Sequence, residues 1–436
     1  MRLIVVGAGV AGLTAADAAR CAGADVTVIE ARNRIGGRTW TAPLGAGSVD
    51  LGAAWVHGPV GNPLAEALAD AGIDTRNDGS FGSGMAVWAD GWADAPEATA
   101  LTSALEGGWD PADVPAEVAA GDSYVDGVEW FMADRELDGR VGNLVRFALV
   151  WVAGGGFISG PPERISLGGA AAFAEGGGGN LIPAGGYRVL VERLASGLDI
   201  RLGTPAKVIE HGGPGVAVRS DDGIYKADRV VVTVPLGVLQ GGDLVFDPPL
   251  AGSRALAVER LAMGTLEKVV FRFEERFWPE SVHWITHVAD DHAFPQWVDL
   301  SRHTGSPTLA AIYNATLTPR IAETPVDQRA GLALEVLRRM FGPVPDPEET
   351  LVTDWTADPW SLGSYSYVPI GAGPEDIRVL AEPVSERLVL AGEATVPESY
   401  GTVHAAFGSG LRAAAHVLGE RPEHISLGAV PKSWLD

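Results

Sequence analysis

The sequence predicts an α/β protein that begins with one unit of a parallel, Rossmann-like sheet. An apolar run at 3–6 leads into a turn with GxGxxG spacing, and an alanine-rich segment of helical character follows. The glycines of that turn are Gly7, Gly9 and Gly12. A second apolar run at 26–29 ends on Glu30, about twenty residues past the glycines. Strand, glycine turn, helix, strand and terminal acid together are typical of dinucleotide binding.

Each residue of this unit has a physical task in holding a dinucleotide. Gly7 permits the tight turn, Gly9 lets the backbone approach a pyrophosphate, and Gly12 lets the helix pack closely on the strand. The start of the helix presents unpaired N–H groups and a positive dipole end to the phosphates. Glu30 would accept hydrogen bonds from ribose hydroxyls, which argues against a cofactor with a 2′-phosphate. The alternative is a glycine-rich turn that binds no ligand.

A second glycine-rich turn follows Glu30. Two arginines, Arg32 and Arg38, flank the adjacent glycines Gly36 and Gly37. A backbone without side chains can pass close to phosphates, and a guanidinium supplies a fork of hydrogen-bond donors. A nicotinamide-dependent dehydrogenase does not need this second turn, whereas FAD, a longer ligand, does. The two turns together therefore favour FAD.

The rest of the chain alternates between further α/β units and less regular segments. Amphipathic spacing predicts helices at 64–72, 188–194, 253–261 and 326–341, and a last helix from about Thr402. Apolar runs predict strands at 200–202, 216–218, 229–234 and 268–273. Between 76 and 180, glycine clusters interrupt short helices, and we expect the tryptophans there to serve core packing rather than a pocket wall.

Composition and charge exclude several functional classes. The chain has 436 residues, 46% of them hydrophobic, which suggests two domains or one large interleaved fold. Its formal net charge of −24 disfavours nucleic acid, whose phosphates need a positive surface, and suits either a cationic ligand or simple solubility. No apolar run approaches the ~20 residues that span a bilayer, and the first strand leaves no room for a signal peptide. With Cys21 as its one cysteine, we expect a cytoplasmic protein.

Several motifs in order resemble the FAD-containing amine oxidase family, and in particular its polyamine oxidase-like branch. They are the GxGxxG turn, Glu30, Arg-Ile-Gly-Gly-Arg at 34–38, and Val-Asp-Leu-Gly-Ala-Ala-Trp-Val-His-Gly-Pro-Val-Gly-Asn-Pro-Leu at 49–64. The resemblance runs from Leu3 to about Leu418. It implies a glutathione-reductase-type FAD-binding domain with an interleaved α+β substrate-binding domain. The first is expected at 1–75, 180–240 and 350–425, and the second at 76–179 and 241–349.

The resemblance also implies where the cofactor is held. The contacts that it adds to the two turns are Ala54, Trp55, Val208, Trp355, Glu393, Thr402 and Val403. Glu393 matches an acid near the ribityl–pyrophosphate part, and the helix from Thr402 would direct its positive end at the flavin N1–C2=O region. Trp355 fits a core tryptophan equally well. Ser364 stands where some relatives have a flavin-linking cysteine, so non-covalent FAD is expected.

The candidates for contact with the substrate or the reacting ring are Lys268, Tyr365, Thr402 and His57. Lys268 resembles the family lysine that holds a water against flavin N5 and favours O₂ reduction, although a strand lysine is usually a solvated edge charge. Tyr365 matches one ring of the family's aromatic cage, and Thr402 stands where several relatives have the second. His57 matches a histidine of the polyamine oxidase motif, with a purely structural histidine as the alternative.

The activity that the resemblance implies is FAD-dependent oxidation of a primary or secondary amine. The amine becomes an imine, then an aldehyde, and O₂ is reduced to H₂O₂. We expect a polyamine or diamine substrate, no nucleic-acid or membrane partner, and a monomer or homodimer. The alternative substrates are a monoamine, a cyclic amine or an L-amino acid. The alternative activities are a carotenoid- or porphyrinogen-type flavin dehydrogenase and a non-catalytic flavin-binding protein.

Overall fold

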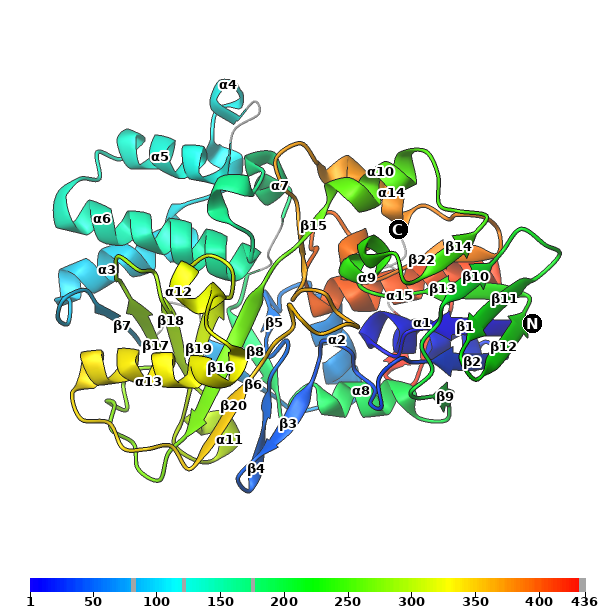
Figure 1. The fold of residues 1–436 in the computed structure, drawn as a ribbon, viewed down its shortest axis with the longest axis horizontal. Helices are drawn as coiled ribbons and strands as arrows, with labels where there is room; N and C mark the ends of the chain where they lie inside the picture. Colours follow the sequence, from blue (N-terminus) through cyan, green and yellow to red (C-terminus); the bar gives the residue numbers. More distant parts are fainter. Residues whose placement is uncertain (80–83, 120–122, 174–176, 431–436) are drawn as a thin grey trace.

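The protein has two lobes, each organised by one main sheet (Figure 1). The computed structural model describes residues 1–79, 84–119, 123–173 and 177–430. The lobe at the right of Figure 1 holds the N-terminal strand, and the lobe at the left holds the sheet that carries Lys268.

The first main sheet is entirely parallel and has the strand order β22-β13-β1-β2-β9. Its strands are β1 (Arg2–Val6), β2 (Asp25–Ile29), β9 (Asp199–Arg201), β13 (Arg229–Val232) and β22 (Leu388–Leu390). Helices α1 (Val10–Cys21), α8 (Arg188–Ala195) and α15 (Val403–Leu418) pack together against it. Strands from the beginning, middle and end of the chain thus form one covered sheet, which explains why they are apolar throughout.

A four-stranded sheet and three helices extend this lobe. The sheet order is β12-β11-β10-β14, with β10 (Val208–Glu210), β11 (Val216–Ser220), β12 (Gly223–Ala227) and β14 (Val245–Asp247). The helices are α9 (Leu236–Gly241), α10 (Ser253–Arg260) and α14 (Pro374–Ala381).

The second main sheet has six strands in the order β20-β16-β19-β18-β17-β7. They are β7 (Met85–Trp88), β16 (Leu266–Arg272), β17 (Trp284–His287), β18 (Gln296–Asp299), β19 (Thr308–Asn314) and β20 (Glu349–Val352). Helix α13 (Val326–Phe341) covers one face, where Phe271, Trp297 and Leu337 share a core. The opposite face carries Val270 and Ala310, and it meets the hairpin β3 (Thr41–Leu44)–β4 (Gly47–Asp50).

The remaining elements are short, and some of them, such as α2 (Pro63–Asp70) and β23 (His424–Ile425), pack on helices α15 and α1 of the first lobe. The small strands are β5 (Val56–His57), β6 (Thr75–Gly79) and β8 (Asn180–Pro183) in one sheet, β15 (Ala262–Met263) with β21 (Ser366–Tyr367), and β23 (His424–Ile425) with β24 (Gly428–Ala429). The α-helices are α2 (Pro63–Asp70), α3 (Ala95–Ser103), α4 (Ala116–Ala119), α5 (Tyr124–Asp134), α6 (Gly139–Phe147), α7 (Leu167–Ala171), α11 (Ser301–Thr304) and α12 (Pro319–Ala322). The π-helical and 3₁₀ turns are η1 (Ala104–Gly108), η2 (Pro111–Asp113), η3 (Ala148–Ile158), η4 (Pro162–Arg164) and η5 (Glu393–Thr395).

Helix α6 continues directly into the π-helical turns of η3. Among the described residues, the combined stretch Gly139–Ile158 is long and apolar enough to cross a membrane by length and composition. In the folded chain 61% of its most apolar window is buried, and a core helix passes the same test.

Strand pairing crosses two of the predicted segment boundaries. Strand β14 lies beyond the boundary at 240 but pairs with β10, and β20 spans the boundary at 349 and pairs with β16. The position of a short strand depends on its hydrogen bonds to strands far away in the sequence. The local sequence pattern does not contain this information, so it could not place β14 and β20. The predicted domain segments stay a prediction.

Candidate functional site

The first glycine turn leaves open space in front of helix α1. Gly7 has a φ of +105°, and a Cβ on Gly12 would stand 1.9 Å from the Gly7 carbonyl oxygen. Gly9 begins the helix without a side-chain cap, and no atom lies within 4 Å of the position that its Cβ would take. At Gly12 the helix therefore packs tightly on the turn. At Gly9 there is open space in front of the helix start, whose first backbone N–H groups have no partner within the helix.

The second glycine turn lies directly against the first. The Gly36 N–H donates to the Ala8 carbonyl oxygen at 2.8 Å, and a Cβ on Gly37 would be 3.4 Å from the Gly9 Cα. Gly37 has a φ of +57°, in the left-handed region that favours glycine. The fold thus joins two motifs that the sequence shows separately into one backbone-lined surface.

Glu30 is buried beside this surface. Its carboxylate accepts hydrogen bonds from the backbone N–H groups of Ala8, at 2.7 Å, and Arg32, at 2.8 Å. The Arg32 guanidinium is paired with Asp358 at 2.5 Å. The Glu30 carbonyl oxygen accepts from the Thr204 N–H, which brings the segment leading to Val208 and β10 beside the first two strands.

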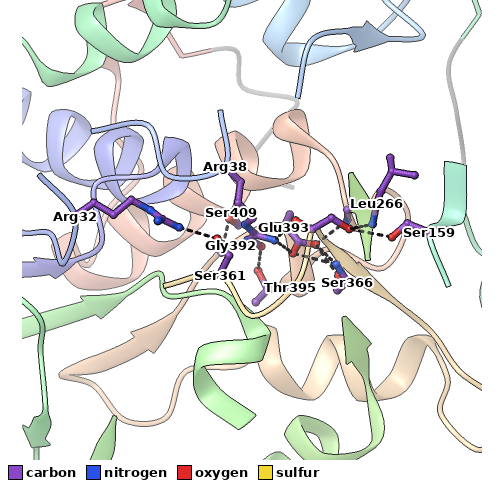
Figure 2. Close-up of polar contacts among 12 residues, drawn as sticks. Arg32, Arg38, Ser159, Leu266, Ser361, Ser366, Gly392, Glu393, Thr395 and Ser409 are labelled. Carbon is purple, nitrogen blue, oxygen red and sulfur yellow. Dashed lines mark hydrogen bonds and ion pairs between the residues drawn. The ribbon is translucent and has the colours of Figure 1, made fainter. Parts of the chain in front are cut away.

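Glu393 is the centre of a second polar cluster, drawn in Figure 2. Its carboxylate pairs with Arg38 at 2.7 Å and accepts from the Ser366 hydroxyl at 2.6 Å and the Gly401 N–H at 2.8 Å. The preceding Gly392 has a φ of +140° and, like Gly9, has no atom within 4 Å of a built Cβ. A cavity of about 20 Å³ lies here, lined in part by Arg38, Gly392 and Glu393.

These features fit FAD. Open backbone at Gly9 and Gly392, an uncapped helix start and the Arg38 guanidinium suit a pyrophosphate, while Glu30 suits ribose hydroxyls. Ser364 shares a hydrogen bond with Ser159 at 3.1 Å and supplies no thiol. Non-covalent attachment of FAD accordingly stays the expectation.

Lys268 is a buried cation and not a solvated edge charge. Its side chain, on β16, is 6% exposed, and its Nζ donates to the carbonyl oxygens of Gly52 at 2.6 Å and Asp50 at 3.0 Å. Nζ also lies 5.3 Å from the centre of the Trp55 ring. Burial lowers the pKa of Lys268 to about 8, and the charge of Asp50 opposes this shift.

Two tryptophans, Trp55 and Trp355, are expected beside the cofactor. Trp55 belongs to the segment at 50–55 that contacts Lys268, and Trp355 packs against that segment. Trp55 Nε1 donates to Asp78 at 2.8 Å, and Asp78 also contacts His303 Nε2 at 2.9 Å. Trp355 Nε1 donates to the Leu51 carbonyl oxygen at 3.4 Å. Ala54, directly before Trp55, is buried. Sequence reasoning missed Asp78 because nothing local distinguishes it from other acids of this acidic chain.

Tyr365 lies between the π-helical turns and the start of helix α15. Its hydroxyl donates to the carbonyl oxygens of Gly156, at 3.1 Å, and Phe157, at 3.0 Å. A Cβ on Gly401 would stand 3.0 Å from the Tyr365 ring. The glycine therefore lets the backbone before α15 approach this ring closely.

Thr402 is the N-cap of α15, as its predicted position at the helix start requires. Its hydroxyl accepts from the Ala405 N–H at 3.1 Å and donates to the Ser399 carbonyl oxygen at 2.7 Å, and Val403 is the first helical residue. Tyr400, two residues before Thr402, packs edge-on against Phe173 and donates to the Gly169 carbonyl oxygen.

His57 belongs to a cluster with a second histidine that the sequence did not single out. His57 Nδ1 lies 2.6 Å from Asn180 Oδ1, and Asn62 links the His57 carbonyl oxygen to His404 Nδ1. Burial, with a contribution from His57, lowers the pKa of His404 to about 4. His404 is therefore neutral at physiological pH.

Residues 10–418 match the family described as flavin containing amine oxidoreductase. The chain belongs to this family. The predicted family, the cofactor FAD and the class of enzyme, an amine-oxidising flavin oxidoreductase, are thereby confirmed.

Curated members of the family that the chain resembles are named as histone demethylases. Lysine-specific histone demethylase 1 homolog 2 of Arabidopsis thaliana is 33% identical over 95% of this chain, and Lysine-specific histone demethylase 2 of Homo sapiens is 30% identical over 95%. A third relative, Lysine-specific histone demethylase 1 homolog 3 of Arabidopsis thaliana, is 31% identical over 96%. The chain spans only 58%, 53% and 30% of the lengths of these relatives.

Solved structures of putrescine oxidase share the fold. A putrescine oxidase bound to putrescine superposes with a TM-score of 0.77 at 22% identity, covering 96% of this chain and 100% of the other. A double mutant of putrescine oxidase gives 0.78 at 23% identity with the same coverage. These likenesses confirm the predicted α/β fold class. They leave the roles of the named site residues as predictions.

Proposed function

We propose that this protein oxidises a polyamine or diamine, releasing an aldehyde after hydrolysis of the imine and reducing O₂ to H₂O₂. The observation that carries this proposal is the buried cation Lys268 beside Trp55, on the sheet face that meets the segment at 50–55. When bound, FAD supplies the electron acceptor that the side chains lack.

The chain's own residues would bind the cofactor, orient the amine and exclude water. Arg38 would hold the pyrophosphate of the dinucleotide and Glu30 a ribose, and the start of α15 presents its positive dipole end. Lys268 holds a positive charge in a water-excluded place, where it stabilises negative charge that develops during O₂ reduction. Tyr365, fixed by its hydroxyl, forms an aromatic wall for the alkyl chain of the amine.

A polyamine or diamine suits the charge of the molecule. The chain has a net charge of −24, and an acidic protein raises the local concentration of cations. We further propose that the protein works in the cytoplasm as a monomer or homodimer, without nucleic-acid or membrane partners. An aminoalkyl side chain on a peptide is the second candidate substrate, since the curated relatives are named as lysine-specific histone demethylases.

Anaerobic mixing of the holoenzyme with single amines tests the proposal. We expect spermidine and putrescine to bleach the visible absorbance of FAD, and O₂ to restore it with one H₂O₂ for each aldehyde. Benzylamine, L-amino acids and a methylated-lysine peptide are compared at equal concentration. If only the peptide bleaches the flavin, the substrate is an amine on a peptide and the proposed polyamine or diamine is wrong. If no amine bleaches the flavin, the proposed activity is refuted.

A further inference from the structure

Lys268 lies in a row of side chains that crosses the second main sheet. Lys268 pairs with Ile312 of β19, and Ile312 pairs with Gln296 of β18. Residues directly opposite in antiparallel strands point to the same face of a sheet. The row Lys268–Ile312–Gln296 therefore leads from the buried cation across one apolar residue to a buried amide.

A cavity lies at the Gln296 end of this row. Its lining includes Trp151, Gly156, Ile312 and Thr318 as well as Gln296, and its volume is about 10 Å³, roughly the room of one water molecule. The Gly156 carbonyl oxygen accepts the hydroxyl of Tyr365. The cavity thus adjoins both the proposed aromatic wall and the row that carries Lys268.

Gln296 has an unsatisfied acceptor beside this cavity. The residue is 2% exposed, and its Oε1 has no hydrogen-bond partner among the described residues. A Cβ on Gly156, another lining residue, would stand 3.6 Å from this Oε1. The neighbouring Asn314 differs, because its amide bonds to the carbonyl oxygens of Ser159 and Gly155. A buried polar atom without a partner costs free energy, so this open acceptor needs a donor, which is supplied either by a water in the cavity or by the N–H of a ligand.

His292 and Trp151 line the cavity, and acidic residues lie near His292, among them Asp291, which is paired with Arg320 at 3.7 Å. The His292 ring stacks on Trp151 with centroids 3.8 Å apart, and burial lowers the pKa of His292. Asp291, Asp290 and Glu163 lie near enough for their charges to oppose that shift. Asp290 and Glu163 are exposed, which places negative charge on the solvent side.

We propose that Gln296 Oε1 accepts an N–H of the second nitrogen of a bound polyamine, that this nitrogen takes the place of the one water that the cavity admits, and that the next ammonium reaches the acidic residues beside His292. A neutral acceptor suits the inner position, because Lys268 already holds a charge in the same row and a second buried cation would be costly there. The proposal rests on the proposed function and makes a triamine a better substrate than a simple alkylamine.

The test compares spermidine with hexylamine, which has no second nitrogen, in the holoenzyme and in Gln296→Leu. We expect kcat/KM for spermidine to fall about tenfold, mainly through KM, and that for hexylamine to change less than twofold. Gln296→Asn keeps a neutral amide acceptor, one methylene shorter, and should retain more spermidine oxidation than the leucine variant. Gln328→Leu, on the exposed start of α13, is the matched control and should behave as wild type.

Binding without turnover separates this subsite from the activity. Spermidine is titrated calorimetrically into enzyme whose flavin has been reduced with dithionite, and Kd should rise about tenfold in Gln296→Leu. Unchanged Kd, or equal loss with both amines, would overturn the role of Gln296 even if amines are oxidised. If no amine bleaches the flavin, the proposed function fails, and the calorimetric comparison still judges the subsite. Gln296→Met serves if the leucine variant does not fold.

Discussion

At Lys268 the surroundings convert a common side chain into a reactive group. Two backbone carbonyl oxygens and the Trp55 ring hold the ammonium in place, while burial favours its neutral form and brings its pKa to about 8. The group is therefore charged at neutral pH and titrates just above it. At Gln296 the surroundings act on a neutral side chain. Its Oε1 is buried without a hydrogen-bond partner among the described residues, which leaves it free to accept from a ligand.

Reoxidation of the reduced enzyme by O₂ should slow as pH rises through about 8. Lys268 carries its charge below its folded pKa and loses it above, and in the proposed role this charge stabilises the negative charge that develops on oxygen. Stopped-flow mixing with O₂ between pH 6.5 and 9.5 measures this dependence.

The variant Lys268→Met should slow reoxidation at least tenfold at pH 7 and remove the pH step, while FAD content stays at the wild-type level. Lys226→Met, at an exposed position of β12, is the control and should keep the wild-type profile. A wild-type rate that is flat across this pH range would contradict the role of Lys268.

At the scale of elements, two glycine turns and one helix start make the dinucleotide surface. Close packing explains Gly12, because a Cβ there would meet the Gly7 carbonyl oxygen at 1.9 Å. Gly9 differs, since its backbone is in an ordinary region and a Cβ would meet nothing within 4 Å. We therefore expect the absence of a side chain at Gly9 to serve the cofactor rather than the fold.

The variant Gly9→Ala should weaken FAD binding at least tenfold and leave the Tm of the apoprotein unchanged. A methyl group in the open space would keep the pyrophosphate from the backbone N–H groups. FAD affinity is measured by quenching of flavin fluorescence, and Tm by calorimetry.

The matched control is Gly331→Ala on α13, where a Cβ also meets nothing within 4 Å. It should stabilise the helix by about 0.5–1 kcal/mol and leave FAD affinity as in wild type. Wild-type FAD affinity in Gly9→Ala would show that the open space is not the cofactor site.

At the scale of the molecule, the site is assembled from chain segments far apart in sequence. Arg38 and Glu393 are 355 residues apart, and Lys268 is 218 residues from the carbonyl of Asp50. A net charge of −24 would also attract the proposed polycationic substrate before any contact forms.

Rising ionic strength should therefore lower kcat/KM for spermidine. Between about 10 mM and 300 mM salt the Debye length falls from ~30 Å to well below 10 Å, which screens the attraction. We expect a loss of several-fold in kcat/KM for spermidine, a smaller loss for singly charged benzylamine, and little change in kcat. Equal salt effects on both amines would exclude steering by charge.

Much of the framework could be predicted from local patterns. The glycine turn, the helix at 326–341 and the helix start at Thr402 are in the structure where their spacing predicts them. Trp151 packs against the core as expected and also lines a cavity, and Gln296 carried no signal because one amide in an apolar run is common. Both outcomes depend on neighbours from distant strands.

The sequence by itself determined the dinucleotide unit, the FAD cofactor and the family, because these follow from residues at short, regular spacings. Only the tertiary structure decided that Lys268 is buried, that the two glycine turns share one surface, and that Gln296 faces a cavity. The physical reason is that burial and unsatisfied hydrogen bonds are properties of packing between distant segments, and packing is absent from local sequence.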